Sequence, residues 1–269
     1  MSMGIMFGAC KYIIDGMLCQ RLGLIIVKSI LLSEAMFFVI VSILAGINNG
    51  FGSLIAESAR ENETECKMLI RNGFRVIILL SIGVTVLCTL CKKPMIRLLV
   101  DWSELYAGTN YYFERWIVTI PFVMLFSYIM VLIRSLGDFK TPCLFIVGAV
   151  LVELGMTRIM VCSNVLSMAT AKVCWNVVLF LIAYGYFRVK YPNLCRGKVN
   201  TKLNWSAWKK IFKSGIVNGV LGLPLALMIL WESKMFAESS AYCYLYLLLG
   251  VLIMAPLMAR LLVGKYSEN

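Results

Sequence analysis

The feature that most constrains this chain is a series of apolar stretches, each close in length to one membrane crossing. A helix needs about 20 mostly apolar residues to cross the hydrocarbon core of a bilayer. Apolar residues make up 61% of the chain and charged residues only 15%, which excludes an ordinary soluble domain. The sequence therefore predicts an all-α, polytopic membrane protein in a lipid bilayer, with about eight transmembrane helices at residues 1–18, 23–47, 73–91, 116–136, 142–162, 165–187, 212–236 and 240–262.

The charged residues indicate topology and exclude several functions. The net charge is +12, but Lys and Arg fall between the apolar stretches, so we interpret the excess as the positive-inside signal and not as a nucleic-acid surface. The bias predicts a multi-pass protein of the plasma (inner) membrane with a cytoplasmic N-terminus. The chain has no histidine and shows no nucleophile–base pair or cluster of metal ligands. We therefore expect no enzyme activity, no resident metal and no cofactor.

Three features indicate how the chain is organised. The first apolar stretch begins at Met1 without a basic flank, which predicts a helix truncated at its start. The stretch from Arg188 to Lys213 is basic and lacks Asp and Glu. The ends of two inward-running segments, residues 53–62 and 260–269, are similar in sequence, as expected of a duplicated bundle. We predict a first lobe of six helices at 1–190, a basic cytoplasmic linker at 191–211, and two helices of a second lobe at 212–269.

Carboxylates inside the apolar stretches are candidates for function, because a charge in the membrane costs at least about 2.5–3.5 kcal/mol unless it has a partner or a cavity. The candidates are Asp15, Glu34, Glu153 and Glu232. Asp15 is either a titrating cation site or the salt-bridge partner of Lys11. Glu153 is either a second titrating group or the partner of Arg158. Glu232 lies near the outer end of its segment, and the role of Glu34 stays open.

A short loop between the fourth and fifth stretches resembles a known family motif. It contains Arg134, Gly137, Asp138, Lys140 and Pro142, in the spacing of the Arg-Gly-x-Gly-Asp-x-Lys-x-Pro loop of the multidrug and toxic compound extrusion (MATE) family. Asp15 followed by Arg21 and Gly23 is similar to the family's first helix. Pro121 matches its helix-four proline, and Pro224 followed by Glu232 is similar to its helix seven.

The resemblance implies a fold and a mechanism. It implies secondary active efflux, in which two six-helix lobes rock around a central cavity and export small cationic or amphipathic organic compounds in exchange for H⁺ or Na⁺. Asp15 would be the cation or proton site, and Na⁺ could bind there. Glu153 and Thr157 fall where one branch of the family has Asn and Asp, so the acid is shifted by one turn. The second lobe would come from a missing half of the protein or from another copy of the chain.

Two other functions stay open. The chain could be a lipid-linked oligosaccharide flippase of the same superfamily, because Lys11, Arg158 and Lys172 place positive charge at the level of the membrane. It could also be an inactive remnant, because four helices of a second lobe are missing. Neither alternative requires an enzyme.

Overall fold

The protein is helical throughout the part that the structure describes. The computed structural model describes residues 23–100, 103–160 and 165–195, together with single positions between 209 and 234, and no strand occurs among them. Five of its helices are long and apolar enough to cross a membrane, which confirms the predicted fold class. The elements are α2 (Leu24–Glu61), α3 (Glu63–Arg97), α4 (Ser103–Ser135), α5 (Lys140–Met160), α6 (Val165–Lys190) and the short α7 (Pro192–Cys195).

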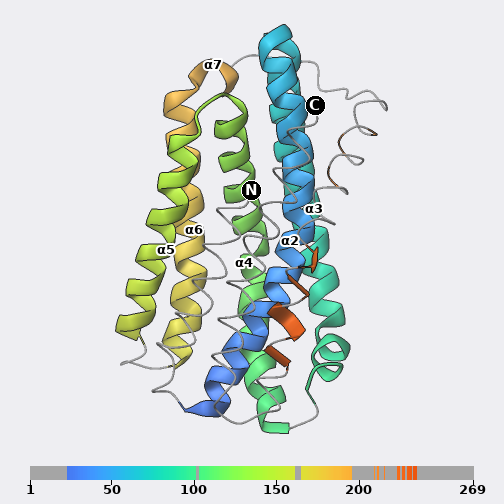
Figure 1. Cartoon of the computed structure of the whole chain (residues 1–269), viewed down its shortest axis with the longest axis vertical. Coiled ribbons are helices and arrows are strands. Elements are labelled where there is room, and N and C mark those ends of the chain that lie inside the picture. The colour runs from blue at the N-terminus through green and yellow to red at the C-terminus, as the bar shows by residue number, and fades with distance from the viewer. Residues whose placement is uncertain are drawn as a thin grey trace.

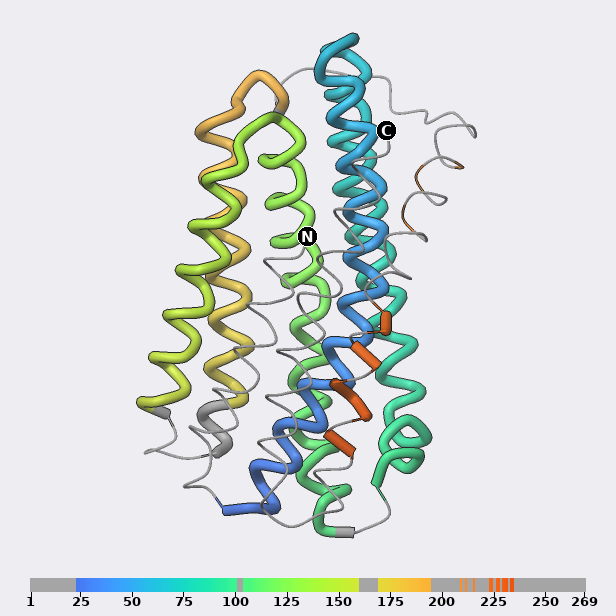
Figure 2. Tube along the Cα trace, viewed as in Figure 1, coloured from blue at the N-terminus to red at the C-terminus, as the bar shows by residue number. Residues whose placement is uncertain are grey.

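The five long helices run along the longest axis of the molecule and alternate in direction (Figures 1 and 2). Helices α2, α4 and α6 run one way, and α3 and α5 return. The α2–α3 junction, the α4–α5 loop and the end of α6 therefore meet at one end of the bundle, beside α7 in Figure 1. These are the basic connections that the sequence places together on the cytoplasmic side. The side of the membrane on which they lie stays a prediction.

Helix α4 is the centre of the bundle. It contacts α2, α3, α5 and α6, and it is apolar on all sides, as expected of a helix surrounded by others. Its side chains Phe113, Met124 and Tyr128 are fully buried. Helix α4 also continues through Pro121, which lacks an N–H to donate to the preceding turn. The remaining helices are thus arranged around a single buried core helix.

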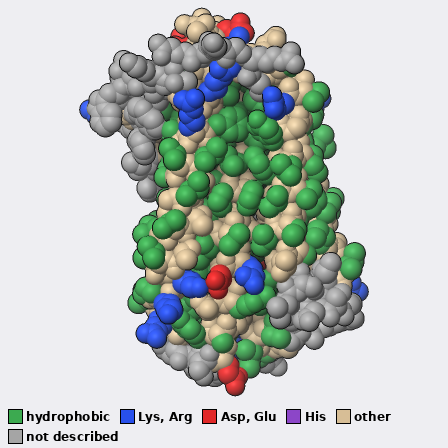
Figure 3. Space-filling model, turned by 180° about the vertical axis from the view of Figure 1, so that it is seen from behind, with side chains coloured by type: hydrophobic (Ala, Val, Ile, Leu, Met, Phe, Trp, Pro, Cys, Tyr) green, Lys and Arg blue, Asp and Glu red, His purple; other side chains and the backbone are tan. Residues whose placement is uncertain are grey.

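The outer faces of α3 and α5 are apolar and exposed. On α3, Leu79 and Leu90 are 71% and 75% exposed, and on α5 Leu144 and Leu151 are 71% and 64% exposed. Figure 3 shows hydrophobic side chains over the middle of the molecule, with Lys and Arg concentrated toward both ends. Such a belt is typical of a surface in contact with lipid. The fold therefore supports an integral, multi-pass membrane protein.

Two helices extend well beyond the apolar stretches predicted for them. The stretches at 23–47 and 73–91 become α2 (Leu24–Glu61) and α3 (Glu63–Arg97), with only Asn62 between them. The Asn62 side chain caps α3 by accepting from the backbone N–H groups of Thr64 (3.0 Å) and Glu65 (3.3 Å). Helix α2 is about 57 Å long, against about 30 Å of hydrocarbon. The apolar stretches therefore predicted which part of each helix lies in the membrane, but they did not predict where each helix begins or ends.

Helix α2 also packs closely on part of the chain that follows the basic linker. A Cβ on Gly50 would lie 2.5 Å from the backbone oxygen of Ile211 and 2.9 Å from the backbone nitrogen of Gly215. Backbones approach this closely only where small residues face each other, as at many interfaces between membrane helices. Residues 211 and 215 thus lie against α2. The lobe boundaries at 190 and 211 stay predictions.

Candidate functional site

Two oppositely charged side chains meet inside the bundle, in the half that is far from the α4–α5 loop. Glu34 lies in the first third of α2, and Lys172 lies near the start of α6. The Lys172 ammonium donates to Oε1 of Glu34 at 2.6 Å. Glu34 is 6% exposed and Lys172 5% exposed, so both charges are withdrawn from the surroundings of the protein. The pair joins α2 to α6 through two residues that lie 138 positions apart in the sequence.

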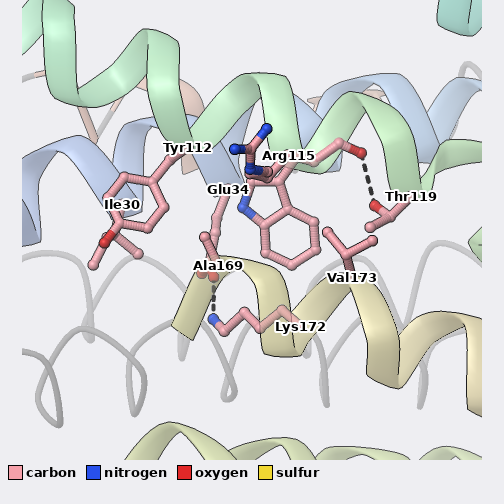
Figure 4. Close-up of a pocket in the computed structure, with 9 residues that line it drawn as sticks. Ile30, Glu34, Tyr112, Arg115, Thr119, Ala169, Lys172 and Val173 are labelled. Carbon is pink, nitrogen blue, oxygen red and sulfur yellow. Dashed lines mark hydrogen bonds and ion pairs between the residues drawn. The ribbon is translucent and has the colours of Figure 1, made fainter. Parts of the chain in front are cut away.

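Aromatic residues of α4 surround this ion pair (Figure 4). The Lys172 ammonium lies over the indole ring of Trp116, 5.5 Å from the ring centroid. Arg115 lines the same pocket, and its guanidinium lies over the ring of Tyr111 at 5.0 Å. The pocket is small, with room for about one water molecule. Its lining residues are Ile30, Glu34, Tyr112, Arg115, Trp116, Thr119, Ala169, Lys172 and Val173.

The pocket can hold one cationic group between a carboxylate and an aromatic face. Both partners favour a cation: the carboxylate through a charge-assisted hydrogen bond, and the indole through the negative face of its ring. Two positive charges, on Lys172 and Arg115, line the pocket against the one negative charge of Glu34. Binding of a further cation is therefore favourable only when the Lys172 ammonium moves out of the pocket.

The predicted residues of α5 lie together, but they do not line this pocket. Glu153 is half-buried, and Thr157 lies one helical turn later and is 1% exposed. Within the described part of the chain, the Thr157 hydroxyl has no hydrogen-bond partner. Their i, i+4 spacing brings both polar groups to one face of α5. Their roles in coupling stay predictions.

The other predicted acids cannot be placed. Asp15 and Glu232 lie outside the described residues. Pro224 is described as a helical and exposed position, and Pro121 is a half-buried residue inside α4. No group of three or more residues that could hold a metal ion occurs in the described ranges.

The loop motif forms a compact connection between α4 and α5. Gly137 has a φ of +94°, a conformation that side chains disfavour. Its N–H donates to the oxygen of Arg134 (3.0 Å), and the N–H of Asp138 donates to the oxygen of Ile133 (3.2 Å). This pair of hydrogen bonds is the Schellman ending of a helix. Gly137 therefore ends α4.

Asp138 then begins α5 and joins it to α6. Its carboxylate accepts from the backbone N–H of Thr141 at 3.0 Å and from the Thr141 hydroxyl at 2.5 Å, as a helix N-cap does. It also accepts from the Lys190 ammonium at the end of α6, and Lys190 donates to the Tyr186 hydroxyl at 3.0 Å. The hydrogen bonds from Lys190 and Thr141 hold the pKa of the Asp138 carboxyl well below its usual range. The link is thus intact at neutral pH, and acid would weaken it below about pH 4.

The rest of the motif also has a structural explanation. The Arg134 guanidinium donates to the side-chain oxygen of Asn49 at 2.8 Å, which ties α4 to α2. Lys140 is exposed, and Pro142 is buried in the first turn of α5, where the missing N–H costs no helical hydrogen bond. The motif residues are therefore brought together around one helix connection, and none of them lines the Glu34–Lys172 pocket.

We expect Gly137→Ala to destabilise the protein by about 1–2 kcal/mol, because a side chain at positive φ is strained. Thermal unfolding in detergent measures the effect. Gly148→Ala is the control: Gly148 lies within α5, and a Cβ there would meet nothing within 4 Å. Equal stability of Gly137→Ala and the wild-type chain would contradict this explanation of the motif.

Sequence reasoning missed the pairing of Glu34 with Lys172. Both residues stand out as charges in apolar stretches, and Lys172 was noted only as a membrane-level cation. The available signal was that two opposite intramembrane charges tend to neutralise each other. Choosing this pair among several acids and bases requires knowing that α2 and α6 both pack on α4.

The fold and the buried charges define a polytopic helical membrane protein with a polar site inside its bundle. A model of the MatE family matches residues 2–159, which is more than half of the chain, and the chain belongs to this family of membrane transporters. This confirms the resemblance that the loop motif indicated.

The comparisons also show how much of a relative this chain spans. It is 24% identical over 192 residues to the probable multidrug resistance protein YpnP of Bacillus subtilis (strain 168), which covers 70% of this chain and 43% of the relative. A structure of a multidrug resistance MATE family transporter of the MOP superfamily in the inward-facing conformation matches with a TM-score of 0.74 and 16% identity, over 85% of this chain and 56% of that one. The MATE multidrug transporter DinF-BH matches with a TM-score of 0.70 and 15% identity, over 96% and 60%. The chain thus spans less than half of its curated relative, and the structures support the fold alone.

Proposed function

We propose that this chain works in secondary active efflux, exporting cationic and amphipathic organic compounds in exchange for H⁺ or Na⁺. The observation that carries the proposal is the family match over residues 2–159, together with a five-helix bundle that superposes on MATE transporters. We place the protein in the plasma membrane with the basic end of the bundle in the cytoplasm, by the positive-inside rule. Its partners are the bilayer, organic cations and a second lobe, which another part of the protein or another copy supplies.

The mechanism is alternating access between two lobes. A carboxylate in the cavity attracts an organic cation when it is ionised, and it releases the cation when a proton or Na⁺ takes its place. The candidates for this exchange are Asp15, Glu153 and Glu232, with Thr157 beside Glu153. Competition for one carboxylate links the two fluxes, because the ion and the substrate then bind at the expense of each other.

The core around α4 is buried and continuous, as a rigid lobe requires, and Ile211 is part of that core.

The flippase alternative has less support from the structure. It relies on membrane-level cations that would hold a pyrophosphate, but the Lys172 charge is already neutralised by Glu34 at 2.6 Å. Among the described lining residues, only Arg115 adds positive charge to that pocket. Against the inactive-remnant alternative, the described helices keep a buried core and a closed connection between α4 and α5.

The test is efflux of ethidium, a fluorescent organic cation, from pump-deficient cells that express the protein carrying this chain. We expect the wild-type protein to lower ethidium accumulation, and Asp15→Asn to remove most of that effect, because the amide cannot exchange a cation for a proton. Collapse of the ion gradient should have the same result as Asp15→Asn. The control is Glu61→Gln, an exposed acid at the end of α2. Unchanged efflux in Asp15→Asn would contradict the proposed coupling.

A further inference from the structure

The ammonium of Lys172 is held as a protein would hold a cationic ligand. It donates to the Glu34 carboxylate at 2.6 Å and lies 5.5 Å from the centre of the Trp116 ring. Figure 4 shows the Lys172 side chain extended from α6 toward Glu34. A carboxylate and an indole face are the groups that recognise organic ammonium ions in binding sites.

We propose that the pocket between α2, α4 and α6 is a binding site for an organic ammonium group, and that Lys172 is its resident occupant. A substrate ammonium binds by replacing Lys172 on Glu34. This inference rests on the proposed function, since it assigns a site for the cationic group of the compound that is exported. It is separate from the predicted acids, because Glu153 and Thr157 do not line the pocket.

The charges of the pocket favour exchange over addition. Among the described lining residues, Lys172 and Arg115 carry two positive charges against the one carboxylate of Glu34, so another cation would add to an unfavourable excess. Arg115 does not take the place of Lys172, because its guanidinium lies over the Tyr111 ring at 5.0 Å. When the Lys172 ammonium leaves, Glu34 keeps Tyr112 and Trp116 as neighbours in the lining of the pocket.

Lys172 is also placed so that it can leave. Lys172 lies seven residues after Val165, the first residue of α6, which places it roughly 10 Å along the helix from that terminus. A lysine at this depth can extend its flexible stem toward the membrane surface. The buried ion pair is not a strong barrier, because the desolvation of both charges offsets most of their attraction. Exchange keeps Glu34 paired throughout, whereas simple loss of Lys172 would not.

The first experiment measures binding of benzyltrimethylammonium to the purified full chain by calorimetry in detergent. We expect Lys172→Ala to bind this probe at least tenfold more tightly than the wild-type chain, because the resident competitor is gone. The double variant Glu34→Gln/Lys172→Ala should lose this gain in affinity, because the carboxylate that binds the probe is also gone. The control is Arg188→Gln, which removes a guanidinium that also lies over a tyrosine, Tyr184 at 5.8 Å, but at the opposite end of the bundle. Equal affinity of Lys172→Ala and the wild-type chain, or of Lys172→Ala and the double variant, would overturn the proposal.

A second experiment uses the wild-type chain, so it does not depend on the folding of a variant. Benzyltrimethylammonium has no reactive amine, and a water-soluble acylating reagent can therefore report on Lys172 while the probe is bound. We expect saturating probe to raise acylation of Lys172 at least fivefold, measured by mass spectrometry of its peptide, with exposed Lys93 unchanged. No rise at Lys172 would overturn the exchange. Calorimetry and acylation do not depend on transport. Efflux without binding in this pocket would contradict the proposed site alone. Binding in the pocket without efflux would contradict the proposed function alone.

Discussion

Glu34→Leu will lower the free energy of unfolding by about 3–5 kcal/mol, the largest effect we expect from a single substitution in this chain. Without the carboxylate that now lies 2.6 Å away, the 5%-exposed Lys172 ammonium must either stay buried and unpaired or give up its packed position. An uncompensated buried charge has lost its hydration and gains nothing in return. Unfolding by denaturing detergent, followed by circular dichroism, measures the loss.

A second substitution separates the charge effect from packing. Glu34→Leu/Lys172→Met should recover to within about 1 kcal/mol of the wild-type chain, because replacing both ions of a buried pair by apolar groups is nearly neutral. The matched control is the ion pair of exposed Glu63 and half-buried Lys67, 2.7 Å apart on one turn of α3. Glu63→Leu should change stability by less than about 1 kcal/mol. A double variant as unstable as Glu34→Leu would show that packing, and not charge, explains the loss.

Gly73→Ala is expected to destabilise the protein by about 3 kcal/mol. A Cβ at this position would overlap the Tyr128 hydroxyl oxygen, and Tyr128 is fully buried. The ring must move, which breaks its 3.1 Å hydrogen bond to the oxygen of Ile70 and its edge-to-face contact with Phe74. Overpacking and a lost buried hydrogen bond each contribute about 1–3 kcal/mol. Thermal unfolding in detergent measures the change.

The control for this prediction lies on the same helix. A Cβ on Gly83 would meet nothing within 4 Å, so Gly83→Ala should be neutral or stabilising by up to about 1 kcal/mol. Adding Tyr128→Phe to Gly73→Ala should recover part of the loss and not all of it, because the Tyr128 ring carbon that bears the hydroxyl lies 2.5 Å from the new Cβ. A stable Gly73→Ala chain would contradict the packing of α3 on α4.

The sequence was sufficient for the fold class and for the family, for a physical reason. In a membrane, length and apolarity alone define a crossing, so the stretches at 142–162 and 165–187 correspond closely to α5 and α6. The Gly137-Asp138 pair could be identified because only four residues separate the end of α4 from the start of α5, and such a short connection favours glycine and a capping acid. Both signals are local in the sequence.

The missed features depend on contacts between distant segments. Apolarity did not indicate that α2 continues to Glu61. Backbone hydrogen bonds form equally well in a helix outside the membrane, so a helix can continue where the apolar stretch ends. The partner of Glu34 could not be chosen, because Lys172 is close only after α2 and α6 pack on α4. Likewise, no turn signal surrounds Gly73 in the sequence. Glycine is needed there because the Tyr128 side chain lies against the backbone of α3. Tertiary packing thus determines the charged pocket.

The central claim is that this chain belongs to a working efflux transporter, and ethidium accumulation tests it most directly. The measurement compares pump-deficient cells that carry the parent protein with cells that carry an empty vector, after the amount of protein in the membrane has been determined. The account predicts lower accumulation with the protein, abolished when the H⁺ and Na⁺ gradients are collapsed. Accumulation equal to that of the empty vector, with the protein present in the membrane, would contradict it.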